Sequence, residues 1–287
     1  MEYVIAGVFL GALYAVLAGG LVLVYRVSKV LNFAAGALGT AVAYLYWEFT
    51  EEWHWAPSSA AALAVLCGVV VSAAAGVAID HASRRYGRAE ATAATAGLML
   101  FLVAGTIWVW GAGLRIVGSV VPGGDRIFDL GSVNITGHQL ATIAWGALYA
   151  LLLHLWLRRT DSGLALRAMS EDDEVAVLHG VRPLPMAALA WAAAGLGSGV
   201  AGILISHIAT LDPVTLTFQM VPAFVGAALG VLRRFGRAYL GSLSLGVLYG
   251  VLGPYSARPG IREVIAYVLL AGTLLMLSSK TRPGEVV

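Results

Sequence analysis

Few side chains in this sequence have the type and spacing that catalysis or metal binding requires. No phosphate-binding loop of the form G-x-x-x-x-G-K-[ST] occurs, and Lys280, one of two lysines, follows two serines rather than a glycine. No cluster of His, Cys, Asp and Glu has metal-ligand spacing, and no G-x-S-x-G or H-E-x-x-H pattern occurs. The sequence therefore predicts no catalytic residue, no metal site and no cofactor bound by this chain.

Ion-coupled transport by the chain alone is also poorly supported. A secondary transporter or proton pump usually carries buried ionisable side chains within its membrane spans. Here Glu48, Asp80, Arg115 and Glu263 fall at the ends of apolar runs, where their charged groups can reach water. His154 lies nearer a helix interior, and we interpret it as a structural histidine rather than a proton relay. Energy for transport is therefore expected from outside the chain.

The densest group of polar side chains lies between residues 158 and 185. Thr160 and its neighbours are good cap residues for a short helix through Leu164. Ser170, with an acid three residues on, predicts the start of a second short helix, which Gly180 should end. The segment therefore reads as two short amphipathic helices lying across one face of the membrane.

The charges of this segment are mixed, with five acids and four arginines. An anionic lipid surface would select a nearly pure basic face, whereas a mixed pattern is better suited to a specific protein surface. Four of its apolar residues fall on one helical stripe: Leu164, Ala168, Val175 and Leu178. We interpret the segment as a docking site for a protein, with a solvated loop as the alternative.

The remainder of the chain consists of apolar runs that must position these side chains. Of 287 residues, 59% are hydrophobic and 12% are charged, whereas a soluble globular chain is about one quarter charged. Crossing about 30 Å of hydrocarbon takes about 20 apolar residues. We predict an all-α integral membrane protein, a polytopic bundle of about nine transmembrane helices (eight to ten), in a single transmembrane domain over residues 1–287. The expected spans are Tyr3–Tyr25, Leu31–Phe49, Pro57–Ile79, Ala91–Leu114, His138–Leu157, Pro185–His207, Val214–Leu232, Tyr239–Gly253 and Ile261–Ser279.

The distribution of basic residues predicts the orientation of the bundle. Alternate connections between these spans hold fourteen of the eighteen Lys and Arg residues. Basic residues concentrate on the cytoplasmic side, which places the N-terminus outside, the C-terminus in the cytoplasm and the 158–185 segment inside. The turn-rich stretch 115–137 then lies outside, where we expect a short hairpin or a plain connector. Small residues four apart, such as Ser198 and Gly202, are interpreted as helix packing rather than pore lining.

Three patches of the chain resemble the ABC permeases for branched-chain amino acids, of the LivH type. The first runs from Gly11 to Tyr25 and continues as Val-Leu-Asn-Phe-Ala-Ala-Gly-Ala-Leu from Val30. The second, Thr-Asp-Ser-Gly-Leu-Ala-Leu-Arg-Ala-Met-Ser-Glu-Asp from Thr160, is similar to the family's cytoplasmic coupling segment. The third is Asp212-Pro213 with the glycine-rich stretch 225–241.

The resemblance implies a subunit of a heteromeric importer in the cytoplasmic (inner) membrane of a bacterium or archaeon. Its partners would be a LivM-type permease, two ATPase subunits that bind ATP and Mg²⁺, an extracytoplasmic substrate-binding protein and membrane lipid, with no nucleic acid. The implied ATPase contact comprises Gly163, Leu164, Arg167, Ala168, Glu171, Asp172 and Gly180.

For the translocation pathway, the candidates are Asn32, Phe33 and Gly36, because a polar amide at a helix start could line a cavity. Alternatively, Asn32 only caps the second helix. Ala35 stands where the family pattern leads us to expect a polar residue, which leaves the solute open among branched-chain or other small amino acids, amides and urea. A secondary transporter or channel acting alone, and a membrane scaffold without transport, are the competing hypotheses.

Overall fold

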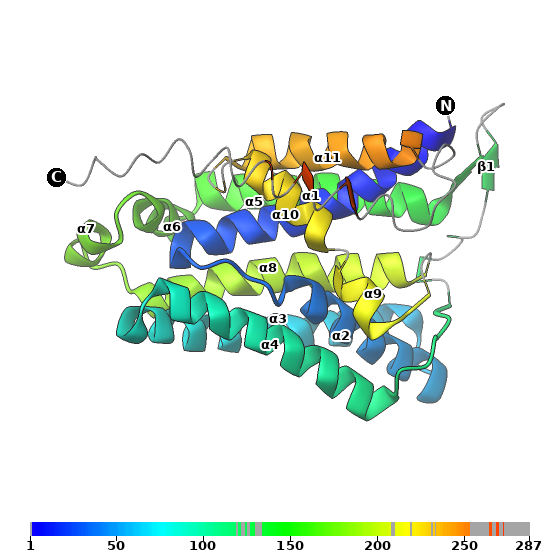
Figure 1. Ribbon diagram of the computed structural model, residues 1–287, viewed down its shortest axis with the longest axis horizontal. Helices are drawn as coiled ribbons and strands as arrows, with labels where there is room; N and C mark the ends of the chain where they lie inside the picture. The colour runs from blue at the N-terminus through cyan, green and yellow to red at the C-terminus, as the bar shows by residue number, and fades with distance from the viewer. Residues whose placement is uncertain are drawn as a thin grey trace.

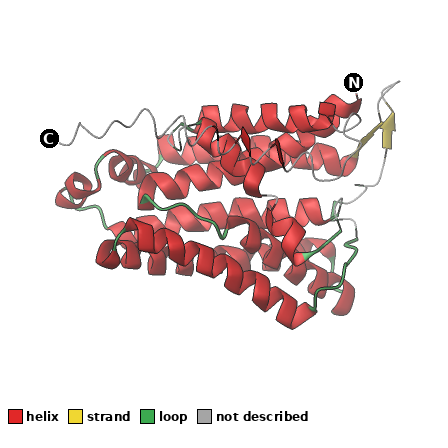
Figure 2. Ribbon diagram, viewed as in Figure 1, coloured by secondary structure: helices red, strands yellow, loops and turns green. Residues whose placement is uncertain are grey.

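The structure is a computed structural model. It describes residues 2–118, 120–121, 124, 127–129, 134–207, 210–218, 220–230, 232 and 234–252, together with five positions between 264 and 272. Most of the described chain is helical, and the long helices run side by side along one axis (Figures 1 and 2). This arrangement confirms the all-α class that the apolar runs predict.

Six helices in the described part of the chain are long and apolar enough to cross a membrane. A helix of 23 residues spans about 34 Å, slightly more than the hydrocarbon layer. They are α1 (Glu2–Ser28), α3 (Pro57–Tyr86), α4 (Arg88–Trp110), α5 (Gly137–Arg159), α8 (Pro183–Ser206) and α11 (Phe235–Leu252).

Helices α1 and α8 form the centre of the bundle, and α4 lies at its edge (Figure 1). In its most apolar stretch α1 is 83% buried and α8 is 67% buried, whereas α4 is 11% buried. The side chains that α4 exposes include Phe101 and Trp108. A helix that is apolar on its outer face as well belongs in lipid or against another membrane subunit.

Two expected spans are broken. The second, Leu31–Phe49, begins as an unwound stretch over residues 29–34 that runs back along the bundle before α2 (Ala35–Trp47) starts (Figure 1). A turn of π-helix, η1 (Glu48–Glu52), continues α2. The seventh, Val214–Leu232, is two short helices, α9 (Pro213–Phe218) and α10 (Met220–Leu229).

The hairpin expected in the 115–137 stretch is present. Strands β1 (Ile127–Asp129) and β2 (Asn134–Thr136) pair antiparallel, with Phe128 opposite Ile135. Thr136 then caps α5 by accepting a hydrogen bond from the Gln139 N–H, while the Gln139 side chain accepts one from the Thr136 N–H.

The two short helices expected in the 158–185 segment are α6 (Asp161–Glu171) and α7 (Asp173–Leu178), and they lie at the opposite end of the bundle from β1 (Figure 1). Thr160 caps α6, as expected. The cap of α7 is Asp172, whose side chain accepts from the Val175 N–H, so the expected Ser170 cap was wrong. The Ser170 hydroxyl instead donates to the Arg167 carbonyl and accepts from Arg26. Gly180, with a φ of 86°, follows the end of α7, as predicted.

Candidate translocation crevice and coupling segment

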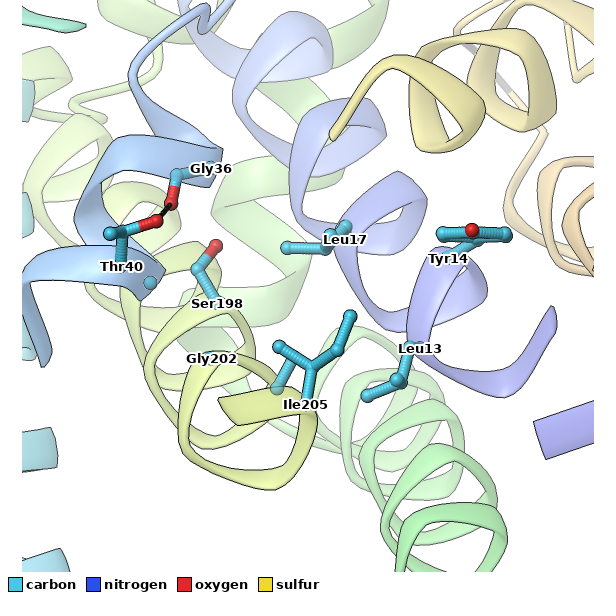
Figure 3. Close-up of a pocket in the computed structure, with 10 residues that line it drawn as sticks. Leu13, Tyr14, Leu17, Gly36, Thr40, Ser198, Gly202 and Ile205 are labelled. Atoms are coloured by element: carbon cyan, nitrogen blue, oxygen red, sulfur yellow. Dashed lines mark hydrogen bonds between the residues drawn. The ribbon is translucent and has the colours of Figure 1, made fainter. Parts of the chain in front are cut away.

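A narrow crevice lies inside the bundle where α1, α2 and α8 meet (Figure 3). Its volume is about 20 Å³, which is room for about one water molecule. Leu13 and Leu17 of α1 face Ile205 of α8, and Thr40 of α2 lies beside Ser198 (Figure 3). We call the crevice closed in this conformation because it is too narrow for a solute larger than water. Its lining is mostly aliphatic with a few hydroxyl groups.

Glycines allow α2 and α8 to touch through their backbones at this crevice. A methyl group added at Gly39 would lie 2.6 Å from the Ser198 carbonyl oxygen, and one added at Gly202 would overlap the backbone of Gly39. The Thr40 hydroxyl donates to the Gly36 carbonyl and lies 3.3 Å from the Thr217 hydroxyl. Small residues let helices approach this closely inside a membrane. Between α2 and α8 no room remains for a methyl group at Gly39 or Gly202.

Side chains bond three backbone groups of the unwound stretch before α2. The Thr95 hydroxyl of α4 donates to the Leu31 carbonyl at 2.7 Å and accepts from the Phe33 N–H at 3.2 Å. The Asn32 side chain accepts from the Ala34 N–H at 3.0 Å. Non-helical backbone at membrane depth requires such partners, because hydrocarbon offers none.

The three predicted pathway residues occupy different positions around this stretch. Gly36 lines the crevice. Asn32 is buried, and its side chain accepts from the Ala34 N–H in the turn that precedes α2. The N-cap position of α2 is Ala34, which supplies no side-chain hydrogen bond, so Asn32 is not the cap residue of that helix. Phe33 packs on Phe224 with ring centroids 5.2 Å apart. All three lie within one turn of the start of α2.

A rigid elbow joins α5 to α6. The Trp156 indole donates to the Ser162 hydroxyl, and the Thr160 hydroxyl donates to the Trp156 carbonyl. Any side chain at Gly163 would overlap the backbone at Trp156 and Leu157. Two large side chains of α6, Leu166 and Met169, are fully buried and fix the helix on the bundle.

The opposite face of the α6–α7 pair is exposed. Leu164, Val175 and Leu178, three members of the predicted apolar stripe, are exposed, and Leu178 is 84% accessible. Of the other predicted contact residues, Arg167, Ala168, Glu171, Asp172 and Gly180 are exposed, and Gly163 is buried in the elbow. Six of the seven predicted residues are therefore open to a partner.

The last turn of α1 is attached to α6 at a place that we call the joint, formed by Arg26, Lys29 and Ser170. The Arg26 guanidinium donates to the Ser170 hydroxyl at 2.8 Å, and the Lys29 ammonium donates to the Ser170 carbonyl at 2.7 Å. Cations near the last carbonyls of a helix are favourable. The joint therefore connects α6 to α1, the helix that also carries Leu13 and Leu17 of the crevice.

Sequence reasoning missed the joint and most of the crevice lining. Arg26 and Lys29 entered the prediction only as topology signals, although two cations in one turn also indicate a nearby acceptor. Ser198 and Gly202 were interpreted as packing residues, and they do pack, but their contact also closes the crevice. In the described part of the chain, no three His, Cys, Asp or Glu side chains gather as a metal site would require.

Residues 3–277 match the family described as the branched-chain amino acid transport system permease component. A LivH permease protein of high-affinity branched-chain amino acid transport from Escherichia coli is 26% identical, over 96% of this chain and 93% of that protein. The BraD permease protein from Pseudomonas aeruginosa is 24% identical over the same shares. With six apolar helices of spanning length, the chain is a multi-pass membrane protein. It belongs to the family of branched-chain amino acid transport permease components.

Proposed function

We propose that the chain is one permease subunit of an ABC importer, and that it carries a branched-chain or other small amino acid, or an amide- or urea-like solute, across the cytoplasmic membrane. A homologous permease, two ATPase subunits and an extracytoplasmic binding protein would complete the transporter. The observation that carries the proposal is the continuous connection from an exposed helix pair, through the joint, to a closed crevice between α1, α2 and α8.

The lining of the crevice supports a small, mainly apolar solute. Leu13, Leu17 and Ile205 would contact an aliphatic side chain of the solute. Thr40 and Ser198, whose side chains carry hydroxyl groups, line the same crevice. Helix α2 begins beside it, and the first amide groups of a helix have no acceptor within that helix. Discontinuous helices with their positive ends near a carboxylate are a common way to bind anionic groups in transporters.

The proposed orientation has nine crossings, with the N-terminus outside and the C-terminus inside. Its support is the placement of basic connections, because the end of α1, the turn between α3 and α4, and the α6–α7 pair lie at one end of the bundle (Figure 1). The β1–β2 hairpin lies at the other end, toward the binding protein. The ninth expected span, Ile261–Ser279, falls almost wholly outside the described residues.

In this mechanism ATP-driven closure of the ATPase subunits moves α6 and α7 by their exposed face. The buried side of α6 and the elbow at Gly163 make the pair move as one body with the end of α5. The joint passes the displacement to α1, which separates from α2 and α8 and opens the crevice. A shift between two states requires differential binding of a few kcal/mol by the partners.

The test is affinity purification of the tagged full-length chain from its native membrane, with and without Leu178→Asp. We expect an ATP-hydrolysing subunit to copurify with the unaltered chain, and the substitution to reduce its recovery about tenfold or more, because a charge replaces an apolar contact. The control is Ile127→Asp, because Ile127 is also an exposed apolar residue and lies at the opposite end of the bundle. Equal recovery from both variants, or uptake by the chain alone driven by an ion gradient, would overturn the proposal.

A further inference from the structure

A second and much larger cavity lies at the end of the bundle that carries α6 and α7. Its volume is about 600 Å³, within the range of ligand sites in proteins. The walls come from the end of α1, the last three turns of α5, α6 and the first two turns of α11. It shares no lining residue with the crevice, so it is a separate site.

Three arginines from three helices line this cavity: Arg26 of α1, Arg158 of α5 and Arg167 of α6. The ion pair in the described residues is between Arg84 and Asp80, so none of the three is paired with a described carboxylate. Arg26 is held in place, since it donates to Ser170 and its guanidinium lies 5.3 Å from the centre of the Phe235 ring. The cavity therefore presents an excess of positive charge, of which the Arg26 guanidinium is held in place.

The structure separates charges that are mixed in the sequence. The acids of the α6–α7 pair, Glu171, Asp172, Asp173 and Glu174, do not line the cavity. Glu171 is close enough to Arg26 for their charges to interact, but one carboxylate does not balance three guanidinium groups. The mixed composition argued against an anionic lipid, whereas the cavity has the nearly pure basic lining that such a lipid selects.

Two further lining residues, His154 and Tyr239, are polar, and the rest of the lining is apolar. Leu153 and Leu157 are buried in the wall formed by α5, and Leu240 on the side of α11 is 68% exposed. The neighbouring outer face of α5 exposes Leu151, Leu152 and Leu155 to the surroundings of the bundle. A charged end and an apolar end in one open cavity match an amphipathic anion better than a soluble one.

We propose that the cavity binds an anionic phospholipid from the leaflet on the α6–α7 side. Its phosphate would be held by Arg26, Arg158 and Arg167, because planar guanidinium groups match phosphate oxygens. One acyl chain would lie along Leu153, Leu157 and Leu240 between α5 and α11. The bound lipid would connect α1, α5 and α6 beside the joint. The lipid site does not require the importer mechanism; only the identity of the leaflet as cytoplasmic rests on the proposed function.

The test uses the purified full-length chain in neutral detergent, titrated with phosphatidylglycerol or phosphatidylcholine and followed by native mass spectrometry. We expect phosphatidylglycerol to bind at least tenfold more tightly than phosphatidylcholine. Arg158→Gln should weaken phosphatidylglycerol binding about tenfold, and Leu240→Trp should weaken it by filling the apolar end. The matched control is Arg159→Gln, because this adjacent arginine is exposed and does not line the cavity.

Four results would overturn the proposal. Equal affinity for the two lipids would remove the role of charge, and equal losses from Arg158→Gln and Arg159→Gln would remove the role of the cavity. Glycerol phosphate competing as well as phosphatidylglycerol would show a soluble-anion site without an acyl-chain contact. Displacement of the lipid by a second permease subunit would identify this face as a subunit interface instead. Arg158 and Leu240 lie outside the proposed ATPase contact, so their substitution should leave the recovery of a copurified ATPase subunit unchanged. Lipid binding and ATPase recovery, measured on the same variants, therefore test the lipid site and the proposed function separately.

Discussion

Helix α1 takes part in both the crevice and the joint, but different forces hold the helices together at the two places. At the crevice, no charged side chain lines the walls, and α2 and α8 touch through the backbones of Gly39 and Gly202. At the joint, Arg26 and Lys29 reach across to Ser170 with charge-assisted hydrogen bonds. One contact is set by atomic size and the other by charge.

This difference has a mechanical consequence. Dispersion contacts lose much of their energy when two surfaces separate by less than 1 Å, so the crevice is either closed or open. Electrostatic attraction falls off more slowly with distance, so long cationic side chains can keep hold of α6 while it moves. The joint is thus suited to transmit a displacement, and the crevice to respond to it by opening.

The largest effect is expected from Gly202→Ala, which breaks the steric contact. The added methyl group would overlap the Gly39 backbone, and overpacking of this kind costs about 1–3 kcal/mol. We expect solute uptake to fall at least tenfold and the thermal midpoint in detergent to drop. Gly97→Ala is the control, because no atom lies within 4 Å of its added methyl group. If Gly202→Ala behaves like Gly97→Ala, the crevice is not closed by backbone contact.

Thr95→Val removes the partner of the unwound stretch and should cost about 2 kcal/mol. Thr95 is fully buried, and its hydroxyl serves both the Leu31 carbonyl and the Phe33 N–H, which would be left without partners. Chemical or thermal unfolding of the purified chain measures the loss. The control is Thr92→Val on the same helix, whose exposed hydroxyl bonds only within α4. Equal stability of the two variants would mean that the stretch before α2 is held by other contacts.

The helical class, the long spans and the α6–α7 pair could be predicted from the sequence because they depend on local apolar runs and cap residues. The break before α2 could not, because its stabilising partner, Thr95, lies 62 residues from Phe33 in the sequence. Likewise, Ser170 and Asp172 are both good cap residues. In the structure Ser170 still belongs to α6, and its hydroxyl accepts from Arg26, 144 residues away in the sequence, so Asp172 is the residue that caps α7.

The candidate site was predicted only in part, for a related reason. The residues of the predicted apolar stripe, among them Leu164 and Leu178, lie on two separate helices, and a stripe does not say whether it faces the bundle or a partner. In the structure Leu166 and Met169 are the buried side chains of α6, and the predicted stripe is the exposed face. Which face packs inward depends on the end of α1 and on α8, which no local pattern contains.

Lys29→Gln tests the force that holds the joint, and we expect a stability loss of about 1 kcal/mol. The neutral amide keeps a hydrogen-bond donor but loses the charge that favours the Ser170 carbonyl at the end of α6. If the joint transmits movement, ATP hydrolysis by the copurified complex should become less dependent on solute, while recovery of the ATPase stays unchanged. Arg85→Gln is the control, since this cation lies at the same end of the bundle on α3 and does not contact Ser170. Unchanged coupling with Lys29→Gln would assign the joint a purely structural role.

Ser170→Ala should have the smallest effect, about 0.5 kcal/mol, and it separates the two bonds of the joint. It removes the hydroxyl that accepts from Arg26, but it leaves the carbonyl that accepts from Lys29. Arg26 keeps its contact with the Phe235 ring, so its position should change little. We therefore expect near-normal coupling and a small decrease in the unfolding midpoint. A loss of coupling larger than that of Lys29→Gln would show that the hydroxyl, rather than charge acting on the helix end, carries the displacement from α6 to α1.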